Sequence, residues 1–500
     1  MFVSTRSSLL LDHFRVPYRI ARAPSANRAG LEVQRISRVE NLSAPAFFSV
    51  RPVAASGQLE HFLGSLPLFA RIASEAETAA WLSESGREWS PALPIRSADG
   101  SAVASVLAAE DGSVFLPFDP DEAIENLWTE RYQLAVESPL RRVLRRYARR
   151  AYYRLRPLAP RALQIRLRRR YTAVQKRSAF PRWPVEPALH DLCELLLSKL
   201  ADVAGAPVPV LAAWPAEYSW ALVLSHDVET EAGVDAVLEL AEEERALGYR
   251  SSWNFVPLRY SVADELLDRL REDGFEIGVH GLKHDGRDFS SRRVFRKRLP
   301  HIREYAKRWG AVGFRSPATH RVWEWMPELG FDYDSSYPDT DPYEPLPGGC
   351  CSWLPFFNND QVELPITLPQ DHTAFTILEE LDGGLWLEKA AYLRERGGMA
   401  LLLTHPDYMA QPDVRGAYRA FLQEFSMDES AWRALPREVA AWWRRRAASR
   451  IVAGRDGWTI VGPATREARI EWVRPTVTID SGNQHGAADA HLDSATAAAP

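Results

Sequence analysis

Residues 276–284 have the sequence EIGVHGLKH, in which a short apolar segment is followed by two histidines, His280 and His284. The segment has the length and composition of a buried strand, and helical patterns flank it at residues 262–272 and 292–308. Two imidazoles four positions apart can close on one metal ion. This stretch therefore predicts a strand–helix fold with a metal site at a strand end.

The same alternation of predicted strands and helices extends in both directions from this strand. Strands are predicted at residues 220–225, 251–256, 275–279, 312–315, 362–364 and 399–404. Helices are predicted at 234–247, 262–272, 292–308 and 437–450. Strand–helix alternation with short connections implies a parallel sheet or barrel, whose site lies at the carboxyl ends of the strands.

Composition shifts divide the rest of the chain. Short apolar runs broken by Gly, Pro and Ser predict an N-terminal mixed α/β accessory region with a helix near 75–83. Near the C-terminus, 457–461 and 468–473 are expected to form a hairpin, and the Ala- and Gly-rich tail is expected to be disordered. We therefore expect five consecutive segments: the accessory region at 1–138, a basic helical segment at 139–200, the strand–helix domain at 206–450, the hairpin at 451–480 and the tail at 481–500.

The segment 141–177 contains fifteen arginines and lysines and no acidic residue. Apolar residues at helical spacing predict an amphipathic helix at 140–152, and a second basic helix is expected at 161–174. Either the apolar stripe packs on the protein and the charges face solvent, or residues 139–177 contact a membrane surface or another polyanion.

The composition is that of a soluble globular protein, with 46% hydrophobic residues, 25% charged residues and a net charge of −5. This balance gives no reason to expect nucleic acid as a partner. The three cysteines, Cys193, Cys350 and Cys351, have no spacing typical of a disulfide framework. Neither a secretory signal nor a run of about eighteen apolar residues stands out, so we expect a cytoplasmic protein, either free or peripheral to the inner face of the membrane.

A second polar cluster, Asp227 and Glu229, follows the apolar run at 220–225. Side chains two positions apart on an extended chain point to the same side. One carboxylate could bind a metal while the other takes a proton from bound water. With His280 and His284 they provide the donors that zinc accepts in open hydrolytic sites, and either carboxylate could be the third ligand.

Five short motifs occur in order: SHDVE (225–229), HGLKH (280–284), GFRSP (313–317), YDSSY (333–337) and LLLTHPD (401–407). In this order they resemble the polysaccharide deacetylases of carbohydrate esterase family 4, the NodB-homology domain. The match covers about half of the chain. The resemblance implies an α/β fold whose main part is a distorted (β/α) barrel of the NodB-homology type.

The resemblance also implies roles for individual residues. Asp227 would be the general base, oriented by Arg315, and His405 would be the general acid, its charge favoured by an acidic neighbour for which we expect Asp334. The metal ligands would be Glu229, His280 and His284, and the metal Zn²⁺, with Co²⁺ or Ni²⁺ as alternatives. Substrate contacts are expected from Pro317, Tyr337, Asp371 and His372.

The implied activity is that of a hydrolase acting on the carbon–nitrogen bond of linear amides. It would remove acetyl from an N-acetylated glycan or from a lipid-linked sugar precursor. Three positions depart from the family pattern: Val228 replaces a metal-binding Asp, Gly281 replaces Ser or Thr, and His226 replaces an aromatic residue. His226 could support the ligands, be a ligand itself, or pack in the core. Two alternatives stay open, a catalytically inactive glycan-binding or assembly protein and a metal-independent cyclic-amide hydrolase on the same fold.

Overall fold

The computed structural model describes residues 1–21, 31–52, 59–136, 160–176, 178–455 and 457–476, with Ser138, Leu140, Leu144 and Tyr147. Its contacts divide the chain into two compact units. The N-terminal unit contains Met1–Asn126, Ala188–Ala212 and Arg446–Pro500, and the barrel unit contains Leu127–Pro187 and Ala213–Arg445. The contacts thus group the chain differently from the consecutive segments expected from sequence. The tail at 481–500 and most of the helix expected at 140–152 lie outside the described residues.

The N-terminal unit is built on a nine-stranded sheet in the order β2-β1-β3-β4-β9-β8-β7-β5-β6. The nine strands, β1 to β9, are Phe2–Ser4, Tyr18–Ile20, Leu31–Ser37, Phe47–Pro52, Glu60–Leu63, Leu66–Phe69, Trp89–Ser97, Ala102–Ala109 and Val114–Leu116. Helices α1 (Leu9–His13) and α7 (Ala188–Ala204) belong to this unit. Helix α2 (Glu75–Glu84) begins at a capping box formed by Ser74 and Glu77. Part of the core is a cluster that includes Phe48, Val50 and Phe115.

The C-terminal strands pair differently from the predicted hairpin. Strand β21 (Gly457–Val461) pairs with β20 (Arg450–Gly454), and β22 (Ile470–Val473) pairs with β10 (Val208–Leu211). The prediction that 457–461 pairs with 468–473 was therefore wrong. Only two residues separate β20 from β21, which favours their local pairing, whereas eight separate β21 from β22.

The barrel unit contains a sheet in the order β16-β17-β15-β14-β13-β12-β11-β18, and β19 also pairs with β11. All of its pairs are parallel except β16–β17. The nine strands, β11 to β19, are Trp220–Val228, Ser251–Phe255, Glu276–His280, Gly313–Arg315, Tyr333–Asp334, Phe356–Asn358, Gln361–Glu363, Met399–Thr404 and Ala431–Ala434. Every residue of β11 is buried, which explains its long apolar run.

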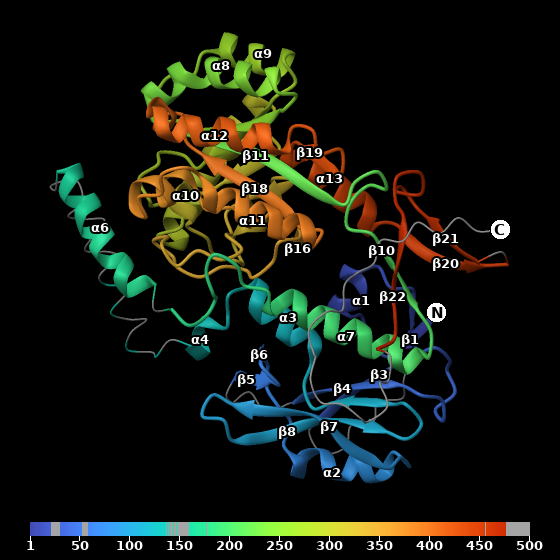
Figure 1. Cartoon of the computed structure of the whole chain (residues 1–500). Helices are drawn as coiled ribbons and strands as arrows, with labels where there is room; N and C mark the ends of the chain where they lie inside the picture. Colours follow the sequence, from blue (N-terminus) through green and yellow to red (C-terminus); the bar gives the residue numbers. More distant parts are fainter. Residues whose placement is uncertain are drawn as a thin grey trace. The chain divides into compact units, whose positions relative to one another are not determined.

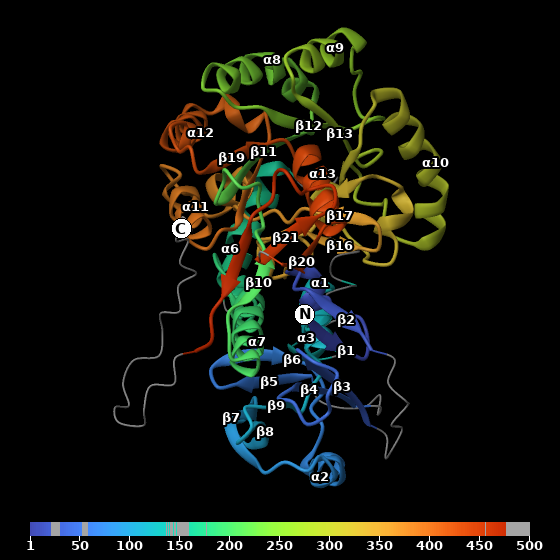
Figure 2. The ribbon, with the colours of Figure 1, turned by 90° about the vertical axis from the view of Figure 1, so that its right-hand side faces the viewer.

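Helices cover the outside of this sheet, as Figures 1 and 2 show. They are α8 (Glu231–Ala246), α9 (Asp264–Glu272), α10 (Arg292–Trp309), α11 (Gly384–Glu395), α12 (Pro412–Phe425) and α13 (Pro436–Ala447). Helices α3 (Pro120–Trp128), α4 (Gln133–Val136) and α6 (Arg161–Gln175) precede them in the chain. The strands and helices expected between 220 and 450 are all present, with ends shifted by a few residues.

The sheet is a curled half-barrel, because its two edge strands, β16 and β18, do not pair with each other. An irregular segment after β17 lies along β18 instead. The Leu368 amide donates to the Leu401 carbonyl at 3.1 Å, and Thr367 Oγ1 donates to the Met399 carbonyl at 2.7 Å. Irregular chain therefore reaches the β18 edge, and it brings the residues after Leu368 to the end of that strand.

Two further properties follow from the described coordinates. Cys193, Cys350 and Cys351 are all buried and free. Among the described residues, none of the helices combines the length and the hydropathy that crossing a bilayer requires.

Candidate functional site

The candidate site lies where neighbouring parallel strands end. Asp227 is the penultimate residue of β11 and Glu229 follows that strand, whereas His280 ends β13 and Arg315 ends β14. His405 directly follows β18. Because β14, β13, β12, β11 and β18 are adjacent and parallel, their carboxyl ends meet at one edge of the sheet.

Three residues form a group with the geometry of a metal site. One donor atom each from Glu229, His280 and His284 lies within 4.8 Å of the other two. Glu229 Oε1 is 2.6 Å from His284 Nε2 and 3.7 Å from His280 Nε2. The structure thus groups Glu229, rather than Asp227, with the two histidines.

The surroundings of His280 fit a role as a ligand. Its Nδ1 lies 3.1 Å from the Arg315 carbonyl, which can only accept a hydrogen bond, so the proton belongs on Nδ1. Its Nε2 is buried and has no hydrogen-bond partner. A bond from the far ring nitrogen to a carbonyl is the usual way in which proteins orient a metal-binding histidine. The donor set therefore suits a divalent ion such as zinc.

Arg259 imposes one condition on metal binding. Its exposed guanidinium lies 2.7 Å from His284 Nδ1 and can only donate, so that ring carries its proton on Nε2, facing Glu229. A metal ion at His284 Nε2 would replace this proton, and Nδ1 would then carry one. The guanidinium would have to turn outward, which an exposed, flexible side chain does readily.

The loop that carries the histidines depends on Gly281. Gly281 and His284 both have positive φ, 63° and 52°, and a Cβ at position 281 would lie 2.5 Å from Asp288 Oδ2. Asp288 Oδ2 accepts a hydrogen bond from the Leu282 amide at 3.2 Å, and Arg298 donates to Asp288 Oδ1 at 2.6 Å. The missing hydroxyl at position 281 thus leaves room for a carboxylate that fixes the loop.

The Asp227 carboxylate contacts residues of the strands β12, β13 and β14. Its Oδ1 accepts hydrogen bonds from Asn254 Nδ2 at 2.9 Å and from Arg315 Nη1 at 3.2 Å, and Oδ2 lies 3.6 Å from His280 Nδ1. Burial alone would raise the pKa of Asp227. Interactions with His280, Arg315 and His405 lower it, and the pKa ends below its ordinary value. Asp227 is therefore a buried carboxylate that stays ionised and keeps one oxygen for other contacts.

Arg315 is 2% exposed and fully engaged. Its Nε donates to the Ser335 carbonyl and its Nη2 to Ser335 Oγ, both at 2.8 Å. Its Nη1 donates to Ser225 Oγ at 2.8 Å, besides Asp227. The guanidinium is thus fixed in orientation and directs one N–H at the Asp227 carboxylate.

His405 pairs with Asp371. The Nδ1 of His405 is 2.6 Å from Asp371 Oδ1, and its backbone amide donates to Asp371 Oδ2 at 2.6 Å. Its Nε2 faces Glu229 Oε1 at 3.6 Å. Burial lowers the pKa of His405, but the carboxylates of Asp371 and Glu229 together outweigh burial and raise it well above the ordinary value.

The acidic neighbour of His405 is thus Asp371, and the expectation of Asp334 in that position was wrong. Asp334 accepts a hydrogen bond from Ser336 Oγ at 2.7 Å and also interacts with Glu363, while burial raises its pKa to about 6. The difference has a tertiary cause: Asp371 follows the irregular segment that lies along β18. Strand periodicity does not predict that closure.

The other residues expected to bind substrate lie at the same end of the sheet in different ways. Pro317 packs against Gly281, within 2.5 Å of the position that a Cβ there would take. Tyr337 is buried, and the Arg321 guanidinium lies 5.1 Å from its ring centre. His372 meets Tyr408 edge to face at 5.4 Å. None of these contacts by itself identifies a ligand.

His226 takes no part in the metal-ligand group. Its Nε2 is 2.6 Å from Glu244 Oε1, its Nδ1 is 2.8 Å from Thr404 Oγ1, and its ring stacks on Trp253 at 4.0 Å between centroids. Of the three possibilities left open, the structure shows packing within a hydrogen-bonded core network.

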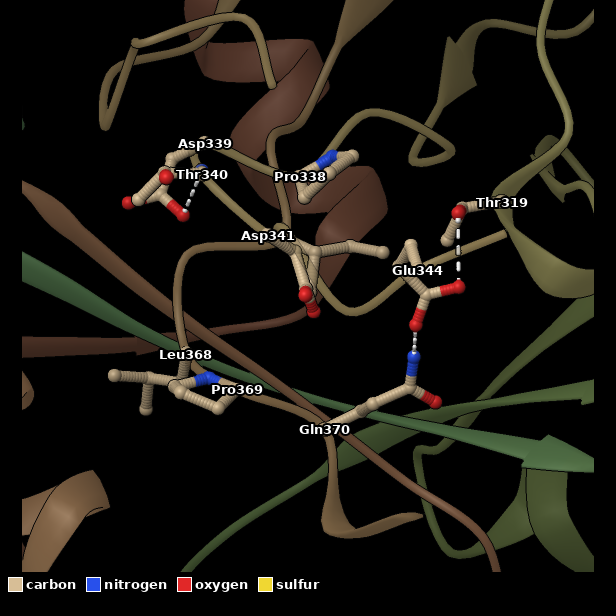
Figure 3. A pocket seen from close by; sticks show the side chains of 10 residues that line it. Thr319, Pro338, Asp339, Thr340, Asp341, Glu344, Leu368, Pro369 and Gln370 are labelled. Carbon is tan, nitrogen blue, oxygen red and sulfur yellow. Dashed lines mark hydrogen bonds between the residues drawn. The ribbon is translucent and has the colours of Figure 1, made fainter. Parts of the chain in front are cut away.

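A pocket reaches Gln370, the residue before Asp371, and its lining also includes Asp341 and Glu344. In Figure 3 the side chain of Gln370 meets the Glu344 carboxyl, and Thr319 Oγ1 donates to that carboxyl at 3.3 Å. Burial and the nearby Glu344 raise the pKa of Asp341 to about 8. The pocket is therefore polar, and two of its three carboxyl groups, those of Asp341 and Glu344, oppose each other's ionisation.

Sequence reasoning missed three residues of the site. Asn254 lies opposite Asp227 in the register of β12 and β11, and Asp288 fixes the histidine loop. Asp407, two positions after His405, has a buried Oδ1 without a hydrogen-bond partner, and burial raises its pKa. Only Asp407 carried a signal, as the last residue of the fifth motif.

No protein-family model matches this chain, and no curated protein sequence matches it either. Among solved structures, it is similar to a Mycobacterium smegmatis protein assigned as a polysaccharide deacetylase, with 20% identity, a TM-score of 0.39, and coverage of 47% of this chain and 93% of that one. It is also similar to Puue allantoinase, with 17% identity, a TM-score of 0.38, and coverage of 47% of this chain and 93% of that one. The third similar structure is the peptidoglycan deacetylase PdaC of Bacillus subtilis, with 12% identity, a TM-score of 0.31, and coverage of 46% of this chain and 94% of that one. Deacetylases are the family that the five motifs resemble.

Proposed function

We propose that this chain is a metal-dependent hydrolase that removes the N-acetyl group from an amino sugar of a surface glycan or of its precursor. One observation carries the proposal: the group Glu229, His280 and His284 lies between two proton-transfer candidates, Asp227 and His405. Glu229 Oε1 is 3.6 Å from His405 Nε2, and Asp227 Oδ2 is 3.6 Å from His280 Nδ1. Hydrolysis of an amide needs both a base for water and an acid for the amine.

The metal ligands in this proposal are Glu229, His280 and His284. Zinc is the preferred ion because it accepts imidazole and carboxylate donors at open sites, and Co²⁺ or Ni²⁺ are alternatives. When bound, such an ion polarises the amide carbonyl and lowers the pKa of a water molecule.

Asp227 is the proposed general base. Its depressed pKa keeps it ionised at neutral pH, and Oδ2 is the oxygen left free by Asn254 and Arg315. It would take a proton from water as the water oxygen attacks the carbonyl carbon. Arg315 is a positioning residue, because it holds the carboxylate and does not itself exchange a proton.

His405 is the proposed general acid. Asp371 keeps its imidazole charged, and Nδ1 is occupied by Asp371, so Nε2 is the nitrogen that can donate. As the carbon–nitrogen bond breaks, Nε2–H would protonate the leaving amine. The products are acetate and the free amino sugar, and Asp227 and His405 then exchange protons with solvent to restart the cycle.

The substrate class in this proposal is an N-acetylated glycan or a lipid-linked sugar. The proposed location is the cytoplasm or the inner face of the membrane, as the sequence predicted. A screen of N-acetyl sugars, free and lipid-linked, with Zn²⁺, Co²⁺ or Ni²⁺ added, tests substrate and metal together through acetate release.

Two variants test the assigned roles. Asp227→Asn should abolish acetate release while metal binding persists, and His280→Ala should lose both. His301→Ala is the matched control, because His301 lies on α10 with its side chain 59% exposed. Acetate release at the wild-type rate by either site variant would refute the roles. Glycan binding without turnover, in protein loaded with metal, would favour the non-catalytic alternative.

A further inference from the structure

Helix α6 (Arg161–Gln175) is attached to the barrel unit by polar groups. Arg168 Nη2 donates to the Tyr343 carbonyl at 3.0 Å, Arg169 Nε to the Thr376 carbonyl at 2.9 Å, and Gln175 Nε2 to the Pro342 carbonyl at 2.7 Å. A surface helix normally turns its apolar stripe toward the core. Here polar side chains make the attachment.

The apolar stripe of α6 faces outward. Leu163, Leu167, Tyr171 and Val174 are 47%, 54%, 55% and 56% exposed. Their spacing of four, four and three residues places them in one line along the helix. The first alternative raised by the sequence, an apolar stripe packed on the protein, therefore does not hold for α6.

The described residues just before α6 in the chain repeat this pattern. Leu140, Leu144 and Tyr147 are 69%, 58% and 62% exposed, and their spacing is four and three residues. Runs of exposed large apolar side chains are unusual on a monomer surface and mark an interaction site.

The charge of α6 identifies the kind of partner. Residues 161–176 contain six arginines and lysines and no acidic residue. Arg166, Arg170 and Lys176 are exposed, and Arg166 and Arg170 adjoin the stripe on the helix surface. Arg169 pairs with Glu379 at 2.5 Å, so its charge is partly balanced. An apolar line flanked by uncompensated positive charge complements an anionic surface with an apolar interior.

We propose that α6 is a membrane-surface helix that binds anionic lipid bilayers. Leucine, valine and tyrosine of the stripe would enter the boundary between headgroups and acyl chains, and Arg166 and Arg170 would contact lipid phosphates. Long basic side chains reach such phosphates while their stems stay on apolar surface. A protein partner would need a groove lined with acidic residues, whereas a bilayer of anionic lipids offers both features everywhere on its surface.

The attachment points connect this helix to the rim of the candidate site. Pro342 and Tyr343 adjoin Asp341 and Glu344 of the pocket, and Thr376 lies in the short helix η4 (His372–Ile377) that follows Asp371. A bilayer under α6 would therefore lie beside this rim, which favours a lipid-linked substrate. That consequence rests on the proposed function, but the lipid binding does not.

Vesicle flotation with the full-length chain tests the binding. Wild-type protein should float with vesicles of phosphatidylcholine and phosphatidylglycerol and not with phosphatidylcholine alone. The bound fraction should fall as salt is raised to about 0.5 M, because salt screens the attraction between charges. Failure to float with anionic vesicles, or equal flotation with neutral ones, would overturn the proposal, whatever the catalytic activity.

Paired substitutions separate α6 from the rest of the surface. The double variants Leu167→Asp/Tyr171→Asp and Arg166→Glu/Arg170→Glu should each bind anionic vesicles at least about tenfold more weakly. Leu238→Asp on α8 is the matched control, since Leu238 is 47% exposed, and it should bind as wild type does. Unchanged circular dichroism shows that the variants fold. Wild-type binding by the Leu167→Asp/Tyr171→Asp protein, or a wild-type dimer in solution that this variant disperses, would refute the bilayer as the occupant of α6.

Discussion

The barrel unit contains two buried histidine–carboxylate pairs, one with His226 inside β11 and the other with His405 directly after the neighbouring strand β18. In each pair a ring nitrogen is 2.6 Å from a carboxylate oxygen: His226 from Glu244, and His405 from Asp371. The second nitrogen of His226 is 2.8 Å from Thr404 Oγ1. The second nitrogen of His405 lies 3.6 Å from Glu229 Oε1, beyond hydrogen-bonding distance.

The difference between the pairs separates structural from chemical roles. Glu244 also accepts hydrogen bonds from Tyr418 and Ser251, both at 2.6 Å, and Trp253 stacks on the His226 ring. Every polar atom of that pair is thus satisfied inside the core. The His405 pair keeps one nitrogen directed at the candidate ligands, so it can still donate a proton. A histidine–carboxylate pair whose polar atoms are all hydrogen-bonded indicates a structural role. A pair that keeps one ring nitrogen available near candidate metal ligands indicates a role in proton transfer.

The largest effect is expected for His405→Ala. Loss of a general acid should lower kcat for acetate release by about 10² to 10⁴. Chemical unfolding should stay cooperative, because the substitution leaves the His226 network intact. A kcat within threefold of wild type would break the distinction between the two pairs.

His226→Ala should act on stability instead. It leaves the buried Glu244 side chain without one hydrogen-bond partner, and losing a buried partner costs about 1–3 kcal/mol of the free energy of unfolding. The kcat of the folded fraction should stay within a few fold of wild type. Urea unfolding and acetate release, measured on the same preparation, check both expectations. A stable but inactive variant would place His226 in the chemistry.

Asp371→Asn should have an intermediate effect and move the pH profile. The Asp371 carboxylate raises the pKa of His405, and the acid must be protonated, so activity falls as pH rises through that pKa. Without the carboxylate, the decline of kcat on the basic side of its pH profile should begin at lower pH. The maximal kcat should fall by about 10- to 100-fold. The same pair stabilises the fold fully below the unfolded histidine pKa of about 6.5, and this contribution is lost as pH rises through the raised folded pKa.

Glu244→Gln is the matched control for this pH shift. It removes the carboxylate from the other pair, so it should lower stability and leave the basic limb of kcat in place. A basic limb that does not move in Asp371→Asn would show that another group than His405 is titrating.

The sequence predicted the part of the site that depends on local pattern. The segments ending in Asp227, His280, Arg315 and His405 read as strand ends, and parallel strands bring their carboxyl ends together without further information. The same local pattern does not distinguish Asp227 from Glu229 as the metal ligand, because both side chains face the same side.

The rest of the site depends on contacts between segments that are distant in sequence. Asp371 reaches His405 through irregular chain, and Asn254 reaches Asp227 through the strand register. Asp288 occupies space that only a glycine at position 281 leaves open. The outward stripe of α6 is a further case, because amphipathic spacing predicts a stripe and not the direction in which it faces.

The smallest expected effect is on metal affinity, through Arg259. Its guanidinium donates to His284 Nδ1 and so favours the tautomer that keeps a proton on the nitrogen facing Glu229. Arg259→Gln removes a positive charge next to the proposed ion. It also lets the His284 ring carry its proton on Nδ1, which leaves Nε2 available to a metal. Since Arg259 is exposed and its charge is screened, the zinc affinity at neutral pH should rise by only about two- to fivefold. Competition with a chelating dye measures this, with Arg245→Gln on α8 as the control. A weaker affinity in Arg259→Gln would mean that the arginine orients His284 for the metal, and that this pairing belongs to the site rather than opposing it.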